Sequence, residues 1–186
     1  MNWILPGTTL PGKRDEAEQI EGQFRSMFLA GGIVLSQVAS ISGLEAYTIQ
    51  NWVKRGFLSP PVKKKYNMDQ LCRILTIHML KSALPMEEIC SLLTYVNGQL
   101  DTAADDLISD ARLYFLFVRL AAHYSMMKNE AGRDNYLEQV MAQATDLSPV
   151  AADRVRQVLR IMLTAWASSL LRQQAENMVL ALKKPD

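Results

Sequence analysis

The sequence contains few of the side chains that carry out catalysis or bind metals. It has two histidines, His78 and His123, and two cysteines, Cys72 and Cys90, among 186 residues. The cysteines are eighteen residues apart and have no neighbouring cysteine or histidine ligand, which fits no zinc-binding spacing. A Gly-rich phosphate loop and the H-E-x-x-H and G-x-S-x-G motifs are also missing. We therefore do not expect an enzyme, a metal site or a cofactor.

Long apolar runs and a leader segment are missing as well. No stretch approaches the ~18–20 apolar residues that span a bilayer, and the run at 113–118 is flanked by Arg112 and Arg119. The start, MNWILPGTTLPG, has no basic region and is interrupted by Pro6 and Gly7, so we do not expect a signal peptide. The low cysteine count is typical of a reducing compartment. These features predict a cytoplasmic protein with no membrane span.

The overall charge is close to zero, but the charges are segregated along the chain. The formal net charge is +1. Residues 33–82 have seven basic and two acidic side chains, a net charge of +5, whereas residues 1–32 and 83–186 have net charges of −1 and −3. A phosphate-binding surface needs positive charge locally rather than over the whole protein. The distribution therefore indicates a candidate nucleic-acid-binding segment.

The stretch from Ser36 to Tyr66 is typical of two helices joined by a tight turn. We expect Ser36 to cap a helix that runs to about Ser42, because its hydroxyl can accept a hydrogen bond from the first turn. Gly43 would provide the left-handed turn, and a second helix would run over residues 45–55.

The spacing of apolar residues predicts how these two helices pack. Small Ala39 would let the helices cross closely, while Ile49 and Trp52 would hold the second helix against the first. The polar side chains of the second helix would then face outward, where they can contact base edges and phosphates. They are Tyr47, Thr48, Gln50, Asn51, Lys54 and Arg55. The alternative is a helical hairpin of an ordinary bundle with a solvated polar face.

A short basic loop follows the second helix. Pro60-Pro61 requires an extended path, after which three consecutive lysines form the densest positive cluster of the chain. The cluster and its neighbour are Lys63, Lys64, Lys65 and Tyr66. Charge runs are often only solvated surface, but beside a recognition helix they can bind phosphates and set the register. We interpret the loop as a short basic wing, which ends where Asn67 and Gln70 predict a capping box.

These residues resemble those of a known class of regulators. The segment LSQVASISGLEAYTIQNWVKRGFLSPPVKKKYNMDQLCRILTIHMLKSALPMEEICSLL resembles the DNA-binding domain of MerR-type regulators in its A-x-x-x-G, T-I-x-x-[YW] and M-E-E-I patterns. The core NWVKRGFLSPPVKKKY resembles still more closely the bacterial domain-of-unknown-function family 1836. The resemblance covers about residues 33–97. It implies a MerR-like winged helix-turn-helix that binds DNA, with no established ligand.

One departure from the MerR pattern concerns the wing. Only residues 61–66 separate Pro60 from the capping Asn67, which is shorter than a MerR-type wing. Whether this segment forms a true two-stranded hairpin is therefore left open.

The rest of the chain is expected to be helical. An irregular arm over residues 1–12 would precede a helix over 13–30, and two helices would follow the wing over residues 69–82 and 85–97. Three more helices are expected over residues 101–127, 133–145 and 149–182. His78 would lie on the apolar face of the helix over 69–82, as a core residue rather than a ligand.

The segment 101–127 is apolar on both faces and must be covered on all sides. Three interpretations of the helical half follow: a self-contained bundle, a homodimer interface, or a small-molecule pocket. We favour the homodimer, because symmetric dimers pair two recognition helices with two DNA half-sites. The candidate pocket residues are Tyr114, Phe115, Phe117, Tyr124 and Trp166.

The sequence thus predicts a mainly α protein in three parts. Residues 1–32 form an arm and a helix, 33–98 a MerR-like winged helix-turn-helix, and 99–186 an all-helical dimerisation or effector region. We expect a transcriptional regulator that reads duplex DNA with helix 45–55 and a short basic wing, as a homodimer. The alternative is a protein-interaction module that uses the same surface.

Overall fold

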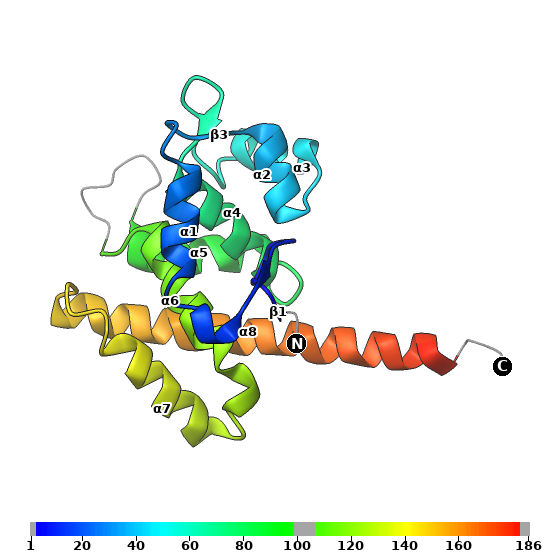
Figure 1. The fold of residues 1–186 in the computed structure, drawn as a ribbon, viewed down its shortest axis with the longest axis vertical. Coiled ribbons are helices and arrows are strands. Elements are labelled where there is room, and N and C mark those ends of the chain that lie inside the picture. The colour runs from blue at the N-terminus through cyan, green and yellow to red at the C-terminus, as the bar shows by residue number, and fades with distance from the viewer. Residues whose placement is uncertain (1–2, 99–106, 183–186) are drawn as a thin grey trace.

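The computed structural model describes residues 3–98 and 107–182 of the chain. These residues form eight α-helices and two small two-stranded sheets, so the expectation of a mainly helical protein is confirmed (Figure 1). Helix α4 (Met68–Leu80) lies at the centre, and ten of its thirteen residues are buried. One hydrophobic core surrounds it and draws on all three of the expected segments.

The N-terminal residues form a hairpin rather than the expected irregular arm. Strand β1 (Trp3–Ile4) pairs antiparallel with β2 (Pro11–Gly12), and Trp3 and Leu5 are buried. The hydroxyl of Tyr114 donates a hydrogen bond of 2.8 Å to the carbonyl of Pro6. The arm is therefore part of the core. Patterns among neighbouring residues could not predict this, because its partner Tyr114 lies 108 residues further along the chain.

The first helix is shorter than expected. A 3-10 helix covers Arg14–Glu16, and α1 runs over Ile20–Met27 instead of residues 13–30. The side chain of Arg14 donates to the carbonyls of Ala121 and Ala122, with the shorter bond at 2.9 Å. Arg14 thus ties the 3-10 helix before α1 to the end of the helix that contains Ala121 and Ala122.

The next two helices form the expected pair. Helices α2 (Leu35–Ser42) and α3 (Ala46–Lys54) are joined through Gly43, whose φ of 70° lies in the left-handed region that glycine adopts without strain. The expected cap at Ser36 is wrong. Strand β3 (Ile33–Val34) ends directly before Leu35, and the side chain of Gln37 accepts from the N–H of Val34 at 3.0 Å. The N-cap is therefore Val34, two residues before Ser36.

The helix after the basic loop begins as predicted. The side chain of Asn67 accepts from the N–H of Gln70 at 2.8 Å, and the side chain of Gln70 accepts from the N–H of Asn67 at 2.9 Å. This reciprocal pair is a capping box, and it fixes the start of α4. Helix α5 (Met86–Asn97) follows, with Pro85 at its N-cap rather than in its first turn.

The C-terminal helices are α6 (Asp110–Ala122), α7 (Glu130–Met141) and α8 (Pro149–Leu182). The expected helix over 101–127 is therefore too long at both ends within the described residues, and its first part, 101–106, lies outside them. A 3-10 helix at Tyr124–Met126 follows α6. The predicted start of the last helix is confirmed, because the hydroxyl of Ser148 accepts from the N–H of Ala151 at 3.2 Å.

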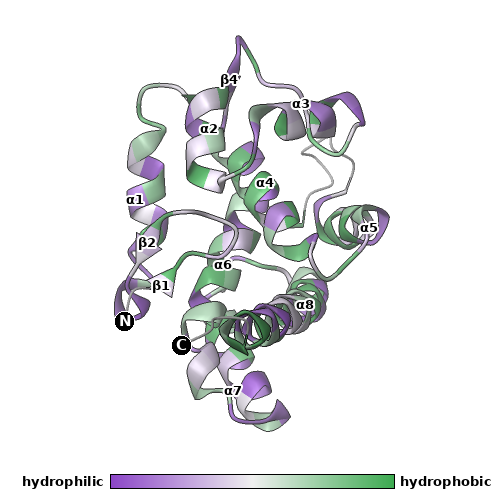
Figure 2. Cartoon of the chain, turned by 90° about the vertical axis from the view of Figure 1, so that its right-hand side faces the viewer, coloured by the Kyte–Doolittle hydropathy of each residue, from purple (hydrophilic) through white to green (hydrophobic). Residues whose placement is uncertain are grey.

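Helix α6 is covered by its own chain. It contacts α4, α7 and α8, and apolar residues on both of its faces are buried. Figure 2, viewed along α8, shows α6 between α4 and the α7–α8 pair, with α2 and α3 at the opposite end of the molecule. The apolar character of α6 therefore does not call for a second copy of the chain. Most exposed large apolar residues of this half lie instead on α8, which extends beyond the body (Figure 1), and Met126 in the 3-10 helix after α6 is exposed as well.

Candidate nucleic-acid interface

One face of α3 carries a row of exposed polar side chains. The row consists of Tyr47, Gln50, Asn51 and Lys54. Their spacing of three, one and three residues places them on one side of an α-helix. Ile49 and Trp52, on the other side, are buried against the core. The predicted division of α3 into a buried and an outward face is thus present, and Tyr47 is 64% exposed.

Two further predicted contact residues lie at the edges of this row. Thr48 is half-buried in the first turn of α3. Arg55 follows the helix, is exposed, and stacks its guanidinium 4.8 Å from the centre of the Phe57 ring. This stacking limits the positions that the Arg55 side chain adopts while leaving its charge at the surface.

The basic loop closes as a tight two-residue hairpin. The N–H of Val62 donates to the carbonyl of Lys65 at 3.1 Å, and the N–H of Lys65 donates to the carbonyl of Val62 at 2.9 Å. Strand β4 (Lys65–Tyr66) then pairs antiparallel with β3. Lys63 and Lys64 are therefore the two residues at the tip. We call residues 62–65 the lysine hairpin.

The backbone at the tip has an unusual conformation. Lys63 and Lys64 have φ values of 49° and 64°, the only positive values at residues other than glycine within the described part of the chain. Such a two-residue turn favours Asn-Gly, because a side chain with a Cβ is strained in the left-handed region. The surrounding hydrogen bonds hold two lysines where smaller residues would be more stable. The two lysines at this exposed tip therefore lower the stability of the fold relative to Asn-Gly.

Lys65 and Tyr66 differ from the tip in their surroundings. The ammonium group of Lys65 donates to the carbonyl of Ala30 at 3.1 Å, which ties it to the segment before β3. Tyr66 is only 3% exposed, and burial raises the pKa of its phenol. We predicted Tyr66 as a surface contact, but its position does not support this. Strand β4 directs its ring inward, into the core.

The cations of this region have no carboxylate partners. Within the described residues, no ion pair involves Lys54, Arg55 or the three lysines of the hairpin region. Most arginines elsewhere are paired, as Arg156 is with Glu138 at 2.7 Å. Unpaired cations on one surface create a local positive potential that attracts anions.

The candidate aromatic pocket is filled by its own side chains. Tyr114, Phe115 and Phe117 are buried, and the ring of Phe117 packs edge to face on Trp166 with centroids 5.8 Å apart. The ring of Tyr124 also packs edge to face on Trp166, with centroids 5.3 Å apart. Tyr114 and Phe115 pack on each other and on Phe24, so the five rings form two groups of aromatic contacts.

Two residues of the surface were missed from the sequence. Val62 is 74% exposed beside the lysine tip, and Leu35 contributes apolar surface below it. Val62 could have been found by reading PPVKKKY as a hairpin, because the residue before a two-residue turn pairs with the residue after it. Leu35 could not have been found in this way. Helix α2 approaches the hairpin only because β3 pairs with β4.

Two absences concern the described residues alone. Within residues 3–98 and 107–182, no group of three or more His, Cys, Asp or Glu side chains is arranged to hold a metal ion. In the same ranges, no helix is both long enough and apolar enough to cross a bilayer.

Comparisons with known proteins show a similarity to one domain family and to one relative, and neither is described by an activity. Residues 33–117 match the model of a family described as a domain of unknown function (DUF1836), so the resemblance to this family is confirmed over that range. The uncharacterized protein YkrK of Bacillus subtilis (strain 168) is 27% identical over 120 residues, which cover 61% of this chain and 51% of YkrK. The chain thus spans about half the length of that curated relative. No solved structure matches the chain. The resemblance to MerR-type regulators stays a prediction.

The matched range contains the surface described above. It begins at Ile33, the first residue of β3, and ends within α6. It therefore contains α2, α3 and the lysine hairpin, together with the helices that support them. It does not include the N-terminal hairpin, α7 or α8.

Proposed function

We propose that this chain is a DNA-binding transcriptional regulator with a MerR-like winged helix-turn-helix. In this proposal α3 enters the major groove of duplex DNA, and the lysine hairpin acts as a short wing that binds the neighbouring phosphates. The chain would act in the cytoplasm and as a homodimer.

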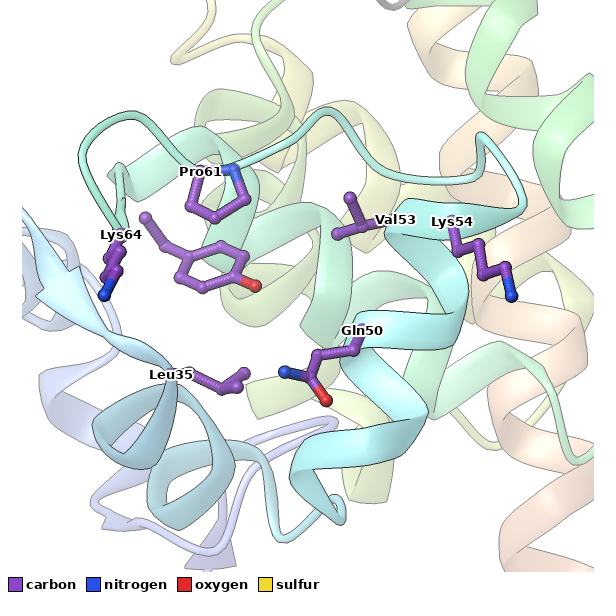
Figure 3. Close-up of a pocket in the computed structure, with 7 residues that line it drawn as sticks. Leu35, Gln50, Val53, Lys54, Pro61 and Lys64 are labelled. Carbon is purple, nitrogen blue, oxygen red and sulfur yellow. The ribbon is translucent and has the colours of Figure 1, made fainter.

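The observation that carries the proposal is the proximity of two kinds of exposed side chain. Gln50 and Lys54 of α3 line the same groove as Lys64 of the hairpin tip (Figure 3). Amide side chains can read base edges, most often by a bidentate contact with adenine, whereas ammonium groups bind phosphates. A helix face and a basic tip side by side are what a reader of duplex DNA needs.

The division of work follows from chemistry and position. Gln50 and Asn51 are the candidates for sequence readout, because they can donate and accept at once. Lys54, Lys63 and Lys64 are candidates for phosphate contacts. Lys65 is a weaker candidate, since its ammonium group is already bound to the carbonyl of Ala30.

The homodimer has separate support on α8. Seven exposed residues of this helix repeat at spacings of three and four, on the side away from the core. They are Ile161, Thr164, Ser168, Leu171, Ala175, Met178 and Leu182. This is the spacing of a coiled-coil seam, and its C-terminal part is the more apolar. Two copies joined along α8 would present two α3 helices to two half-sites.

The proposal is tested by measuring DNA affinity as a function of salt. Fluorescence anisotropy on a labelled 30-base-pair duplex would give the slope of log K against log salt concentration. Each phosphate contact contributes about 0.9 to this slope, so Lys63→Gln/Lys64→Gln should reduce it by up to about two units. The control is Lys128→Gln. Lys128 is an exposed lysine that is distant in sequence from α3 and the lysine hairpin, so its replacement should leave the slope unchanged.

Sequence readout needs a second measurement. Selection of bound fragments from the source genome should yield a preferred sequence with the unmodified protein, and Gln50→Ala/Asn51→Ala should weaken that preference while the salt slope stays unchanged. A protein with no affinity for any fragment contradicts the function. An unchanged slope in the lysine variant removes the hairpin from the DNA contacts.

A second candidate function is favoured by two exposed side chains. Tyr47 and Val62, 64% and 74% exposed, are an aromatic and an apolar group beside the polar row of α3 and the lysine tip. Such residues anchor protein–protein interfaces. A module that docks a protein through this surface would lose its partner in Tyr47→Ala, and its DNA affinity would be negligible at physiological salt.

A further inference from the structure

We propose that the groove between α3 and the lysine hairpin binds a small amphipathic carboxylate, and that this ligand and DNA exclude each other. The binding site follows from the groove itself. The exclusion of DNA rests on the proposed function.

The groove has an apolar floor. Its volume is about 470 Å3, within the range of small-molecule sites in proteins. Leu35 of α2, Val53 of α3 and Pro61 of the extended segment line it, together with the ring of Tyr66. In Figure 3, the side chains of Leu35 and Gln50 point toward each other from α2 and α3, while Pro61 and Val53 lie across the groove from Leu35. Hydrocarbon of a ligand would be removed from water here, which favours binding in proportion to the area buried.

The rim of the groove is polar and positive. Gln50, Lys54 and Lys64 line its edge, and both lysines are exposed and lack carboxylate partners within the described residues. A lysine side chain is long and rotates freely, so either ammonium group can turn toward an anion at the mouth of the groove. A ligand that joins an apolar body to a negative group matches this arrangement of floor and rim.

Tyr66 adds a hydrogen-bond donor to the floor. Its ring is buried, yet its hydroxyl makes no hydrogen bond within the described residues. A phenol whose ionisation is disfavoured by burial stays a donor at neutral pH. A carboxylate is the acceptor that gains most from such a donor, because hydrogen bonds to charged groups are the stronger ones.

Bound DNA would not make apolar contacts with the floor of the groove. The backbone that would pass between α3 and the hairpin is anionic and hydrated, and Leu35, Val53 and Pro61 offer it no polar partner. Phosphates would contact the lysines at the rim and leave the floor beneath them. The floor therefore fits a second occupant with apolar surface of its own.

The two occupants compete because they need the same side chains. Gln50, Lys54 and Lys64 are at once the rim of the groove and part of the proposed DNA contacts. A carboxylate seated in the groove would neutralise one positive charge and cover the base of the α3 row. The apparent affinity for DNA would then fall by the factor one plus the ratio of ligand concentration to its dissociation constant.

The experiment uses 2-naphthoate as the probe and 2-naphthamide as its neutral analogue. Binding to the full chain is measured by isothermal titration calorimetry and located by the NMR shift of the Gln50 side-chain amide. We expect naphthoate to bind and to shift this amide. Because the charge supplies a contact to lysine and to the phenol, naphthamide should bind at least about tenfold more weakly.

Two variants and one control locate the site. Val53→Asp places a carboxylate in the floor and should reduce naphthoate affinity more than about tenfold, by charge repulsion and lost apolar contact. Tyr66→Phe keeps the ring and removes the donor, so it should also weaken naphthoate binding. Val150→Asp makes the same valine-to-aspartate change at an exposed position on α8 and should bind naphthoate like the unmodified chain.

Each outcome decides the proposal. Absent naphthoate binding, equal binding of naphthamide, or unchanged affinity in Val53→Asp would overturn the carboxylate site. If naphthoate binds in the groove and leaves DNA affinity unchanged, the exclusion is overturned and the site stands. If the chain binds naphthoate but no DNA, the function proposed above fails while the carboxylate site is still supported.

Discussion

The guanidinium of Arg73 lies 3.3 Å from the carboxylate of Asp110 and joins the centre of α4 to the first turn of α6. The same side chain donates through Nε to the carbonyl of Phe57 at 3.1 Å, in the segment between α3 and the lysine hairpin. Arg73 is 4% exposed. One buried side chain thus connects the surface proposed to bind DNA with the helical half.

Replacing Arg73 should destabilise the protein strongly. Arg73→Met removes the guanidinium that pairs with Asp110 and the N–H that donates to the Phe57 carbonyl. Removing one partner of a buried pair costs about 3–5 kcal/mol in the free energy of unfolding, measured by urea denaturation. Asp134→Ala breaks the half-exposed pair between Asp134 and Arg160 and should cost less than about 1 kcal/mol. Equal effects of the two variants would contradict the structural role of Arg73.

The lysine hairpin should be stabilised by the residues that its turn prefers. Asparagine and glycine adopt positive φ values with less strain than lysine. Lys63→Asn/Lys64→Gly should therefore relieve backbone strain at the tip and raise the free energy of unfolding by about 1 kcal/mol. It also removes two charges and should weaken DNA binding. Lys63→Gln/Lys64→Gln removes the same charges without relieving the backbone, so DNA affinity should fall while stability stays close to that of the unmodified protein. A gain in stability shared by both variants would mean that charge repulsion, and not backbone strain, limits the turn.

Stability should fall as the pH drops below about 6.5 because of His78. Burial lowers the pKa of its imidazole below the ordinary 6.5, and the charge of Lys81 lowers it further. The hydrogen bonds to the backbone of Gly7 and Ser42 raise the pKa, but by less. The unfolded chain therefore binds a proton at a higher pH than the folded protein does. The resulting contribution to stability is complete above 6.5 and is lost as the pH falls toward the folded pKa.

This dependence can be measured by denaturation between pH 7.5 and pH 5. His78→Asn retains an N–H that can donate to the carbonyl of Gly7, now 3.2 Å from Nδ1, and has no group that titrates in this range. The variant should show a smaller loss of stability across the window. An identical slope in both proteins would exclude His78 as its source.

The exposed row on α8 should control self-association. Leu171→Glu and Met178→Glu place charges on the row at positions that are 62% and 63% exposed in one chain. If two copies pair along α8, sedimentation velocity should show a dimer for the unmodified protein and monomers for these variants. Asn177→Glu adds the same charge next to the row but off it, and should remain a dimer. A monomeric unmodified protein at micromolar concentration would contradict the α8 interface.

The sequence predicted the elements that depend on neighbouring residues. The capping box of Asn67 and Gln70, the turn at Gly43 and the two faces of α3 follow from hydrogen bonds and packing within a few positions. These features define the α3 part of the candidate surface.

Long-range contacts account for the features that the sequence could not predict. Arg14 binds the end of α6, a contact that no local pattern around α1 predicts, and the placement of the lysine hairpin beside α2 depends on the pairing of β4 with β3. The inward position of Tyr66 follows from that pairing, whereas the sequence alone placed this residue on the surface. The groove beside α3 is likewise formed by three segments that meet only in the fold.

The N-terminal hairpin has a consequence for protein synthesis. The hairpin is synthesised before the helices that bind it: Gly7 contacts His78, 71 residues further along the chain, and Pro6 accepts a hydrogen bond from Tyr114, 108 residues further along. Contacts of such sequence separation slow folding, because a long loop must close before they form. The surface of α2 and α3 thus becomes fully supported only after α6 has emerged. A nascent chain that stops before α6 would lack the Tyr114 hydroxyl that holds Pro6, so we expect this interval to be one in which the chain needs chaperones.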